Sequence, residues 1–193
     1  MSKHVLIALG LLLLAAPALA FDGSRKGFIL GVGAGGGATS FKQELSGFAT
    51  GKTETETKGA FATDFELGWG ANDQLLIYYS NHVHWFGITN VFNNSVTIAS
   101  GVSSAAVSYF FKPAAPSAVV EGGIGGAGWN ALSGGQSSSS VGLGVWAGGG
   151  YEFSRHWLVR GKITYGKPSD DQGGVKLETT ATGFGVTVNY LAY

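Results

Sequence analysis

The segment from Tyr78 to His84 contains the side chains of this sequence that are best suited to catalysis. Ser80 offers a hydroxyl nucleophile, and His82 and His84 offer imidazoles that act as bases or metal ligands elsewhere. In an extended strand, Ser80 and His82 share a face but lie about 6–7 Å apart, too far for a direct hydrogen bond. We therefore predict that these residues line a larger structure, and we assign no catalytic residue.

Metal and cofactor sites are not indicated either. The sequence has four histidines and no cysteine. His82 and His84 are close enough to share an ion, but a third ligand is not evident. The stretch from Gly31 to Gly36 approximates a dinucleotide-binding fingerprint, yet no helical pattern follows it. We predict no metal and no cofactor.

Charged residues of both signs recur on one face of the alternating segments. Asp64 and Glu66 take even positions, whereas Phe65 and Leu67 take odd ones. Opposite charges on one face of a narrow sheet predict an ionic network across a lumen; the alternative is that they lie unpaired in water near the rims. The predicted network comprises Asp64, Glu66, Glu121, Glu152, Arg160 and Lys162.

A period of two positions occurs in eight segments of the chain, and this period indicates β-strands whose two faces meet different surroundings. The inward face is rich in glycine, which makes up 33 of the 193 residues. The predicted strands are Gly27–Gly37, Lys58–Gly70, Gln74–Trp85, Val96–Phe111, Ser117–Trp129, Val141–Phe153, Trp157–Gly166 and Val175–Tyr193.

The connections between these segments alternate in length. Short turns are expected at Ala71–Asp73, Lys112–Pro116 and Ser154–His156. Longer polar loops are expected at Ala38–Thr57, His84–Ser95, Asn130–Ser140 and Lys167–Gly174. Short turns at one end and long loops at the other predict an all-β fold: an eight-stranded, antiparallel, up-and-down transmembrane β-barrel.

The first twenty residues have the features of a signal peptide. Lys3 precedes the apolar run Val5–Leu14, and Ala18-Leu19-Ala20 fits the small-residue cleavage rule. We predict a cleaved signal peptide at 1–20 and a barrel domain at 21–193. Charged residues make up only 12% of the chain and the net charge is zero, which argues against a nucleic-acid partner.

Aromatic residues gather near both ends of the predicted strands. Amphipathic rings prefer the two membrane interfaces, so we expect two belts around a spanning barrel; the alternative is a soluble barrel with aromatics in its core. The belt near the short turns comprises Trp69, Tyr109, Phe111, Tyr151, Phe153, Trp157 and Tyr190. The belt near the long loops comprises Phe61, Trp85, Trp129 and Tyr165.

With these features the chain resembles the small eight-stranded bacterial outer-membrane barrels, the superfamily of the outer membrane protein A transmembrane domain and the outer membrane protein X type. The resemblance rests on the architecture, the leader and the last strand, which ends in Tyr193. It implies a bacterial outer membrane location, periplasmic termini, contact with outer-membrane lipids and lipopolysaccharide, and a C-terminal signal, Tyr190 and Tyr193, for the barrel assembly machinery. Tyr190 lies three residues before the end, rather than the usual two.

The function we expect is non-enzymatic: a barrel with a packed polar lumen that serves envelope structure or presents surface loops to a protein partner. One alternative is a lipid-modifying hydrolase that uses Ser80 and His82. Their segment loosely resembles the His-x-Ser-Asn stretch of outer-membrane lipid A deacylases, with Tyr78 in place of the catalytic histidine. A second alternative is a narrow channel or small-ligand carrier, because glycine-lined walls can leave a cavity.

Overall fold

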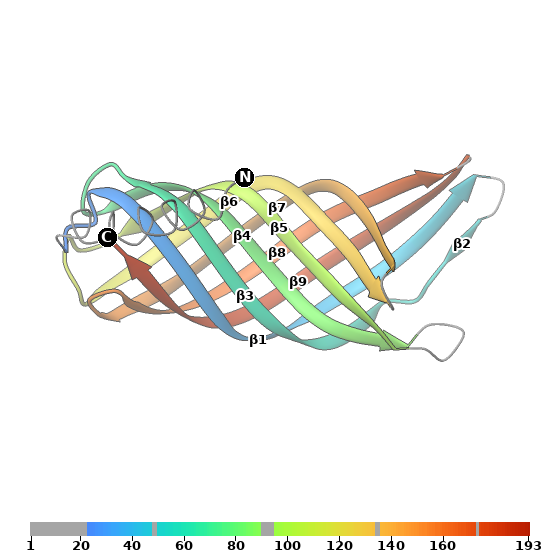
Figure 1. Ribbon diagram of the computed structural model, residues 1–193, viewed down its shortest axis with the longest axis horizontal. Helices are drawn as coiled ribbons and strands as arrows, with labels where there is room; N and C mark the ends of the chain where they lie inside the picture. Colours follow the sequence, from blue (N-terminus) through green and yellow to red (C-terminus); the bar gives the residue numbers. More distant parts are fainter. Residues whose placement is uncertain (1–22, 48–49, 90–94, 134–135, 173) are drawn as a thin grey trace, which may run out of the picture.

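The computed structural model is a single antiparallel sheet that closes into a barrel (Figure 1). It describes residues 23–193 except 48–49, 90–94, 134–135 and 173, so the predicted signal peptide lies outside the described residues. The strands of the described residues are β1 (Gly27–Gly47), β2 (Gly51–Lys52), β3 (Glu56–Gly70), β4 (Leu75–Thr89), β5 (Ser95–Phe110), β6 (Ser117–Ser133), β7 (Gln136–Ser154), β8 (Trp157–Gln172) and β9 (Val175–Ala192).

Each long strand pairs with its neighbour in the chain, and β1 pairs with β9 to close the ring. The two-residue strand β2 pairs with β1 at Glu44 and Leu45, and β3 pairs with β1 over Gly27–Phe41. The strand β2 therefore continues the path of β3, and eight long strands form the wall. The predicted eight-stranded, up-and-down antiparallel barrel is confirmed.

Several strands extend farther than the sequence predicts at the end where the longer loops are expected, which we call the loop end. β1 reaches Gly47 rather than Gly37, and β8 reaches Gln172 rather than Gly166. The four predicted loops, Ala38–Thr57, His84–Ser95, Asn130–Ser140 and Lys167–Gly174, are therefore wrong over most of their length. The apolar pattern stops there, but the backbone ladder does not, because β1 and β9 stay paired from Leu30–Ala192 to Gly47–Val175.

The opposite end, which we call the turn end, agrees with the predicted short turns. Asn72 accepts hydrogen bonds from the backbone amides of Gln74 and Leu75 through its Oδ1 atom. Gln74 therefore belongs to the turn rather than to β4, where the sequence placed it. No helix in the described part of the chain is long and apolar enough to cross a membrane.

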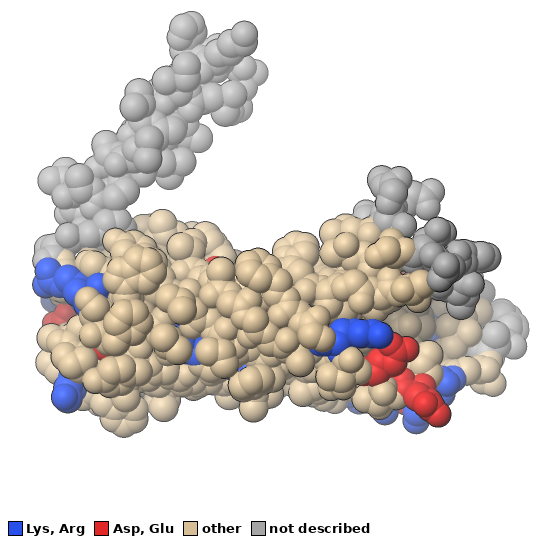
Figure 2. Space-filling model, turned by 90° about the horizontal axis from the view of Figure 1, so that it is seen from below, with Lys and Arg blue, Asp and Glu red and all other residues tan. Residues whose placement is uncertain are grey.

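The two faces of the wall differ as the alternation predicts. The side chains of Phe65, Leu67 and Val145 are 41–43% exposed on the exterior, whereas those of Glu66 and Arg160 are at most 2% exposed in the lumen. Figure 2 shows a nearly uncharged middle, with lysine, arginine and acidic residues gathered toward the two ends. An exterior of this kind is the apolar band of a spanning barrel.

Two glycines show how closely the narrow wall is packed. A Cβ atom on Gly35 of β1 would lie 2.0 Å from the backbone carbonyl oxygen of Val186 on β9. A Cβ atom on Gly183 would lie 2.3 Å from the ring of His84, which crosses the lumen from β4. These positions have no room for a side chain.

Candidate functional site

The centre of the lumen contains a buried cluster of five charged residues from three strands. β8 supplies Arg160 and Lys162, β3 supplies Asp64 and Glu66, and β6 supplies Glu121. Each of these strands alternates, so these five side chains point inward while the residues beside them along the strand do not. We call these five residues the central cluster.

The cations of the central cluster contact more than one carboxylate each. Arg160 forms an ion pair with Glu66, and its Nε lies 3.6 Å from Oε2 of Glu121. Lys162 Nζ lies 3.0 Å from Oδ2 of Asp64, 3.4 Å from Oε1 of Glu66 and 3.7 Å from Oε1 of Glu121. The sheet places β9 and β1 between β8 and β3, so these contacts cross the lumen rather than follow the wall.

Neutral side chains add hydrogen bonds to Asp64 and to one oxygen of Glu121. Thr187 donates to Oδ2 of Asp64 at 2.7 Å, and His82 Nδ1 lies 2.8 Å from Oδ1 of the same carboxylate. Tyr78 and Ser108 both donate to Oε2 of Glu121, at 3.3 and 3.1 Å. Buried charges are tolerated where they are paired and hydrogen-bonded in this way.

Glu152 lies apart from the central cluster, at the turn end of the lumen. Its carboxylate forms an ion pair with Arg25 and accepts a 2.7 Å hydrogen bond from the hydroxyl of Tyr193. Arg25 also donates to the backbone carbonyls of Asp73 and Lys112 and lies over the ring of Phe110. The predicted single network thus divides in two, and we call Arg25, Glu152 and Tyr193 the turn-end plug.

Sequence reasoning missed Arg25 because it lies before the first alternating segment, where parity says nothing of its direction. It is nevertheless 1% exposed, and it seals the barrel from a segment outside the strands. A buried inward Glu152 with no cation at its own level was the signal that could have prompted a search for a partner in the flanking segments.

Three aromatic side chains fill the lumen at the loop end. Phe41, Phe86 and Trp129 lie with ring centroids 4.9–5.7 Å apart, and Val96, Ile98 and Ala181 surround them. The assignment of Trp129 to the exterior belt is wrong, since its side chain is 6% exposed. The physical reason is parity on β6: Trp129 is an even number of residues from Glu121, so both point inward.

The other predicted belt residues have exposed side chains. Their exposed fractions run from 37% for Trp85 to 60% for Trp69. On the outer wall at the turn end, the rings of Trp157 and Tyr190 are 5.3 Å apart. The alternation ends after Tyr190, because Leu191, Ala192 and Tyr193 are all buried; of the two aromatics in the predicted assembly signal, Tyr190 faces out and Tyr193 faces in.

Little space remains between these layers. A cavity beside the central cluster, lined in part by Asp64, His82, His84 and Lys162, has a volume of about 10 Å³. A second, lined in part by Val102, Ala127 and Thr164, is equally small. A volume of this size holds about one water molecule.

The residues considered for catalysis have other partners. Ser80 shares a 2.7 Å hydrogen bond with Ser104, while His82 faces Asp64, so the structure does not bring hydroxyl and imidazole together as nucleophile and base. His84 is buried against the wall at Gly183. Within the described residues, no group of three His, Cys, Asp or Glu side chains is placed to hold a metal ion.

Comparison with known proteins gives matches among solved structures alone. No family model and no curated protein sequence matches the chain. The outer membrane protein OprG of Pseudomonas aeruginosa is similar over 90% of this chain and 99% of its own, with 14% identity and a TM-score of 0.52.

Two further solved structures show weaker similarity. Neisserial surface protein A covers 86% of this chain and 97% of its own, with 16% identity and a TM-score of 0.47. Ail, the attachment invasion locus protein of Yersinia pestis, covers 84% and 99%, with 14% identity and a TM-score of 0.42. In its closed ring of eight long strands, its apolar exterior and its likeness to OprG, the chain has the fold of the small outer-membrane β-barrels of the outer membrane protein A and X type.

Proposed function

We propose that this chain is a non-conducting, non-enzymatic barrel of the bacterial outer membrane that holds an extended β-sheet at the cell surface. The observation that carries the proposal is the filling of the lumen at three levels: the turn-end plug, the central cluster and the Phe41–Phe86–Trp129 layer. An eight-stranded wall encloses only enough space for such side chains.

The orientation in the membrane follows from the ends of the barrel. Outer-membrane barrels place short turns in the periplasm and the longer segments outside the cell, and here the longer segments are the extended hairpins of the loop end. Both described ends of the chain, Gly23 and Tyr193, lie at the turn end, where Arg155 donates to the carbonyl of Gly23 and Tyr193 meets Glu152. We therefore place the termini in the periplasm, where the barrel assembly machinery would read Tyr190 and Tyr193.

The loop end is where interaction with other molecules is best supported. β1, β8 and β9 project beyond the other strands at this end (Figure 1). The projecting sheet carries charged residues on a rigid ladder, an arrangement suited to recognition of lipopolysaccharide or of a protein partner. The burial of Ser80 and its bond to Ser104 favour this role over hydrolysis of a membrane lipid.

Cell fractionation tests the location. The chain should appear in the outer-membrane fraction, and unboiled protein should migrate differently from boiled protein on a denaturing gel, as folded barrels do. Recovery in the soluble periplasm with no heat-dependent shift would overturn the membrane assignment.

Planar-bilayer recording tests the closed lumen. Wild-type protein inserted into a bilayer should give no steady ion conductance, and removal of the Phe41, Phe86 and Trp129 side chains alone should not create one, because the other two layers remain. Reproducible single-channel steps from the wild type would replace the proposal with a narrow channel.

A further inference from the structure

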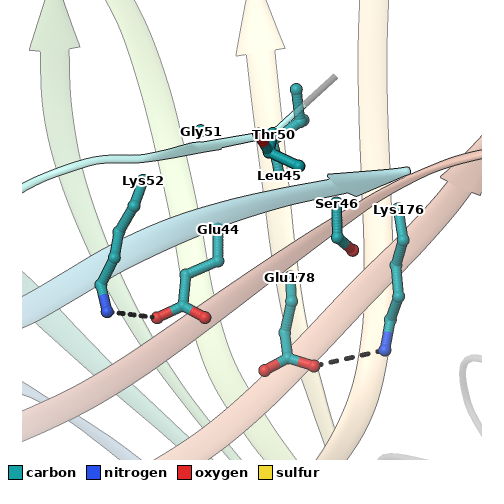
Figure 3. Close-up of a pocket in the computed structure, with 8 residues that line it drawn as sticks. All are labelled: Glu44, Leu45, Ser46, Thr50, Gly51, Lys52, Lys176 and Glu178. Carbon is teal, nitrogen blue, oxygen red and sulfur yellow. Dashed lines mark hydrogen bonds and ion pairs between the residues drawn. The ribbon is translucent and has the colours of Figure 1, made fainter. Parts of the chain in front are cut away.

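A depression of about 420 Å³ lies at the loop end, where β1, β2 and β9 run side by side. Figure 3 shows Glu44, Lys52, Lys176 and Glu178 with their side chains directed to one side of these strands. Lys42 follows the same parity on β1 as Glu44, and its Nζ lies 3.1 Å from the carboxylate of Glu44. We call the lysines Lys42, Lys52 and Lys176, with Glu44 and Glu178, the outer charged patch.

The outer charged patch lies on the lipid-facing side of the wall. Along β9, the outward positions are Val188, Val186 and Phe184, and after two threonines they become Glu178 and Lys176. At about 3.3 Å per residue and a strand tilt of about 40°, Lys176 lies roughly 20 Å above Phe184 along the barrel axis. Lys42, which is opposite Thr180, lies roughly 10 Å above Phe184 by the same estimate. Apolar surface therefore gives way to ammonium groups over the depth that lipid headgroups occupy.

The ion pairs within the outer charged patch leave its lysines accessible to a ligand. Lys52 and Lys176 lie 3.1 and 3.3 Å from Glu44 and Glu178, and their side chains are 63% and 48% exposed. Exposed pairs of this kind contribute little free energy, so an incoming phosphate can take their place. Hydrogen bonds from Lys52 and Lys42 lower the pKa of Glu44, which keeps its carboxylate charged and able to accept hydrogen bonds.

We propose that the outer charged patch binds the headgroup of a phosphorylated glycolipid in the surrounding membrane. Three ammonium groups match phosphate oxygens, while Glu44, Glu178 and the hydroxyl of Ser46 match sugar hydroxyls, and the depression is in the size range of small-molecule sites. The height of the patch above the apolar band favours a tall sugar headgroup. This inference rests on the proposed function, which names lipopolysaccharide as one candidate at the loop end, and it assigns particular residues to recognition of such a headgroup.

A lipid-retention experiment tests the inference. The full chain is reconstituted in phosphatidylcholine vesicles that contain a minor fraction of diphosphorylated lipid A or of the same lipid without phosphates, then extracted in mild detergent and analysed by native mass spectrometry. Wild-type protein should retain the phosphorylated form preferentially. Replacement of the three lysines by glutamine should reduce retention by about fivefold for each lysine, and replacement by arginine should preserve it.

Lys58 provides the matched control. It forms a 3.2 Å ion pair with Glu56 and is 40% exposed, but it lies on β3 opposite the buried Thr39 and so on the inner face of the same sheet. Lys58→Gln should therefore leave retention unchanged.

The outcomes separate this inference from the proposed location. Three results would each overturn the headgroup site: equal retention of both lipids, a loss of retention in Lys58→Gln as large as that for one patch lysine, or displacement of the glycolipid by inorganic phosphate. Each of these results would still leave a barrel that inserts into vesicles and shifts on heating. A chain that fails to insert into vesicles at all would instead contradict the membrane location.

Discussion

Arg160 on β8 forms an ion pair with Glu66 on β3 across the lumen, although β9 and β1 separate these strands in the sheet. The contact joins two strands that backbone hydrogen bonds do not join directly. Both side chains are fully or almost fully buried, so each compensates in part for the desolvation of the other, together with Glu121 and Lys162.

Arg160→Ala should lower the stability of the folded barrel by about 3–5 kcal/mol, because Glu66 and Glu121 would keep their burial and lose a cation. The measurement is the urea midpoint in detergent or vesicles, followed by the heat-dependent gel shift. Lys26→Ala, which removes an exposed cation at the turn end, should leave the midpoint where it is. Equal midpoints for Arg160→Ala and wild type would show that the central cluster contributes nothing to stability.

Gly35 and Gly36 offer a contrast between adjacent positions. Gly35→Ala would place its Cβ 2.0 Å from a backbone oxygen of β9, whereas a Cβ on Gly36 meets nothing within 4 Å. We expect Gly35→Ala to destabilise the barrel by about 1–3 kcal/mol or to slow closure of the β1–β9 seam, and Gly36→Ala to be neutral. Urea midpoints and folding yields in vesicles distinguish the two variants. Similar values for both would mean that the β1–β9 seam accommodates an added methyl group at Gly35.

The direction of most strand side chains could be predicted from the sequence because parity is a local property. Phe65 and Glu66 face opposite ways for the same reason that any neighbouring residues in a strand do, so the members of the central cluster were identifiable without knowledge of the fold. The same rule, applied to β6 from Glu121, places Trp129 inside. The wrong assignment followed from its place beside the predicted loop Asn130–Ser140.

The partners of the inward side chains, and the pairing of distant polar segments, could not be predicted in the same way. The choice of Arg25 as the partner of Glu152 depends on how the segment before β1 folds back under the barrel, and no periodic pattern specifies that path. Likewise, the extension of β1 and β9 beyond the apolar band depends on backbone pairing between polar segments far apart in the chain. The position of a residue in a strand determines which face of the sheet its side chain is on, whereas the closure of the whole barrel determines which residue it contacts.

Glu152→Gln should release the segment before β1. The substitution removes the charge that faces Arg25, whose guanidinium is buried, and a stranded buried charge costs about 3–5 kcal/mol. Cleavage after Arg25 by trypsin should then become faster by on the order of a hundredfold, as measured by mass spectrometry of the released N-terminal fragment. Glu54→Gln, at an exposed position of the loop end, serves as the control. Unchanged protection of the Arg25 bond would show that the other contacts of Arg25 hold the segment without Glu152.

We expect the buried hydroxyl of Tyr193 to make the folded barrel less stable at high pH. Burial, followed by the hydrogen bond to Glu152, raises the pKa of the Tyr193 hydroxyl to about 12, above its ordinary value of about 10. The neutral hydroxyl is therefore favoured in the folded state. The contribution of this hydroxyl to the free energy of unfolding is complete below pH 10 and declines as the pH rises to 12. The reason is that the unfolded chain then releases a proton that the folded chain still holds.

The thermal midpoint of the wild type should accordingly fall more steeply between pH 10 and 12 than that of Tyr193→Phe, which has no hydroxyl to titrate at this position. Tyr190→Phe removes an exposed hydroxyl from the outer wall and should follow the wild-type curve. Parallel curves for wild type and Tyr193→Phe would show that the turn-end plug does not bury this hydroxyl in the working protein. A difference confined to this pH range would tie the last residue of the chain to closure of the turn end.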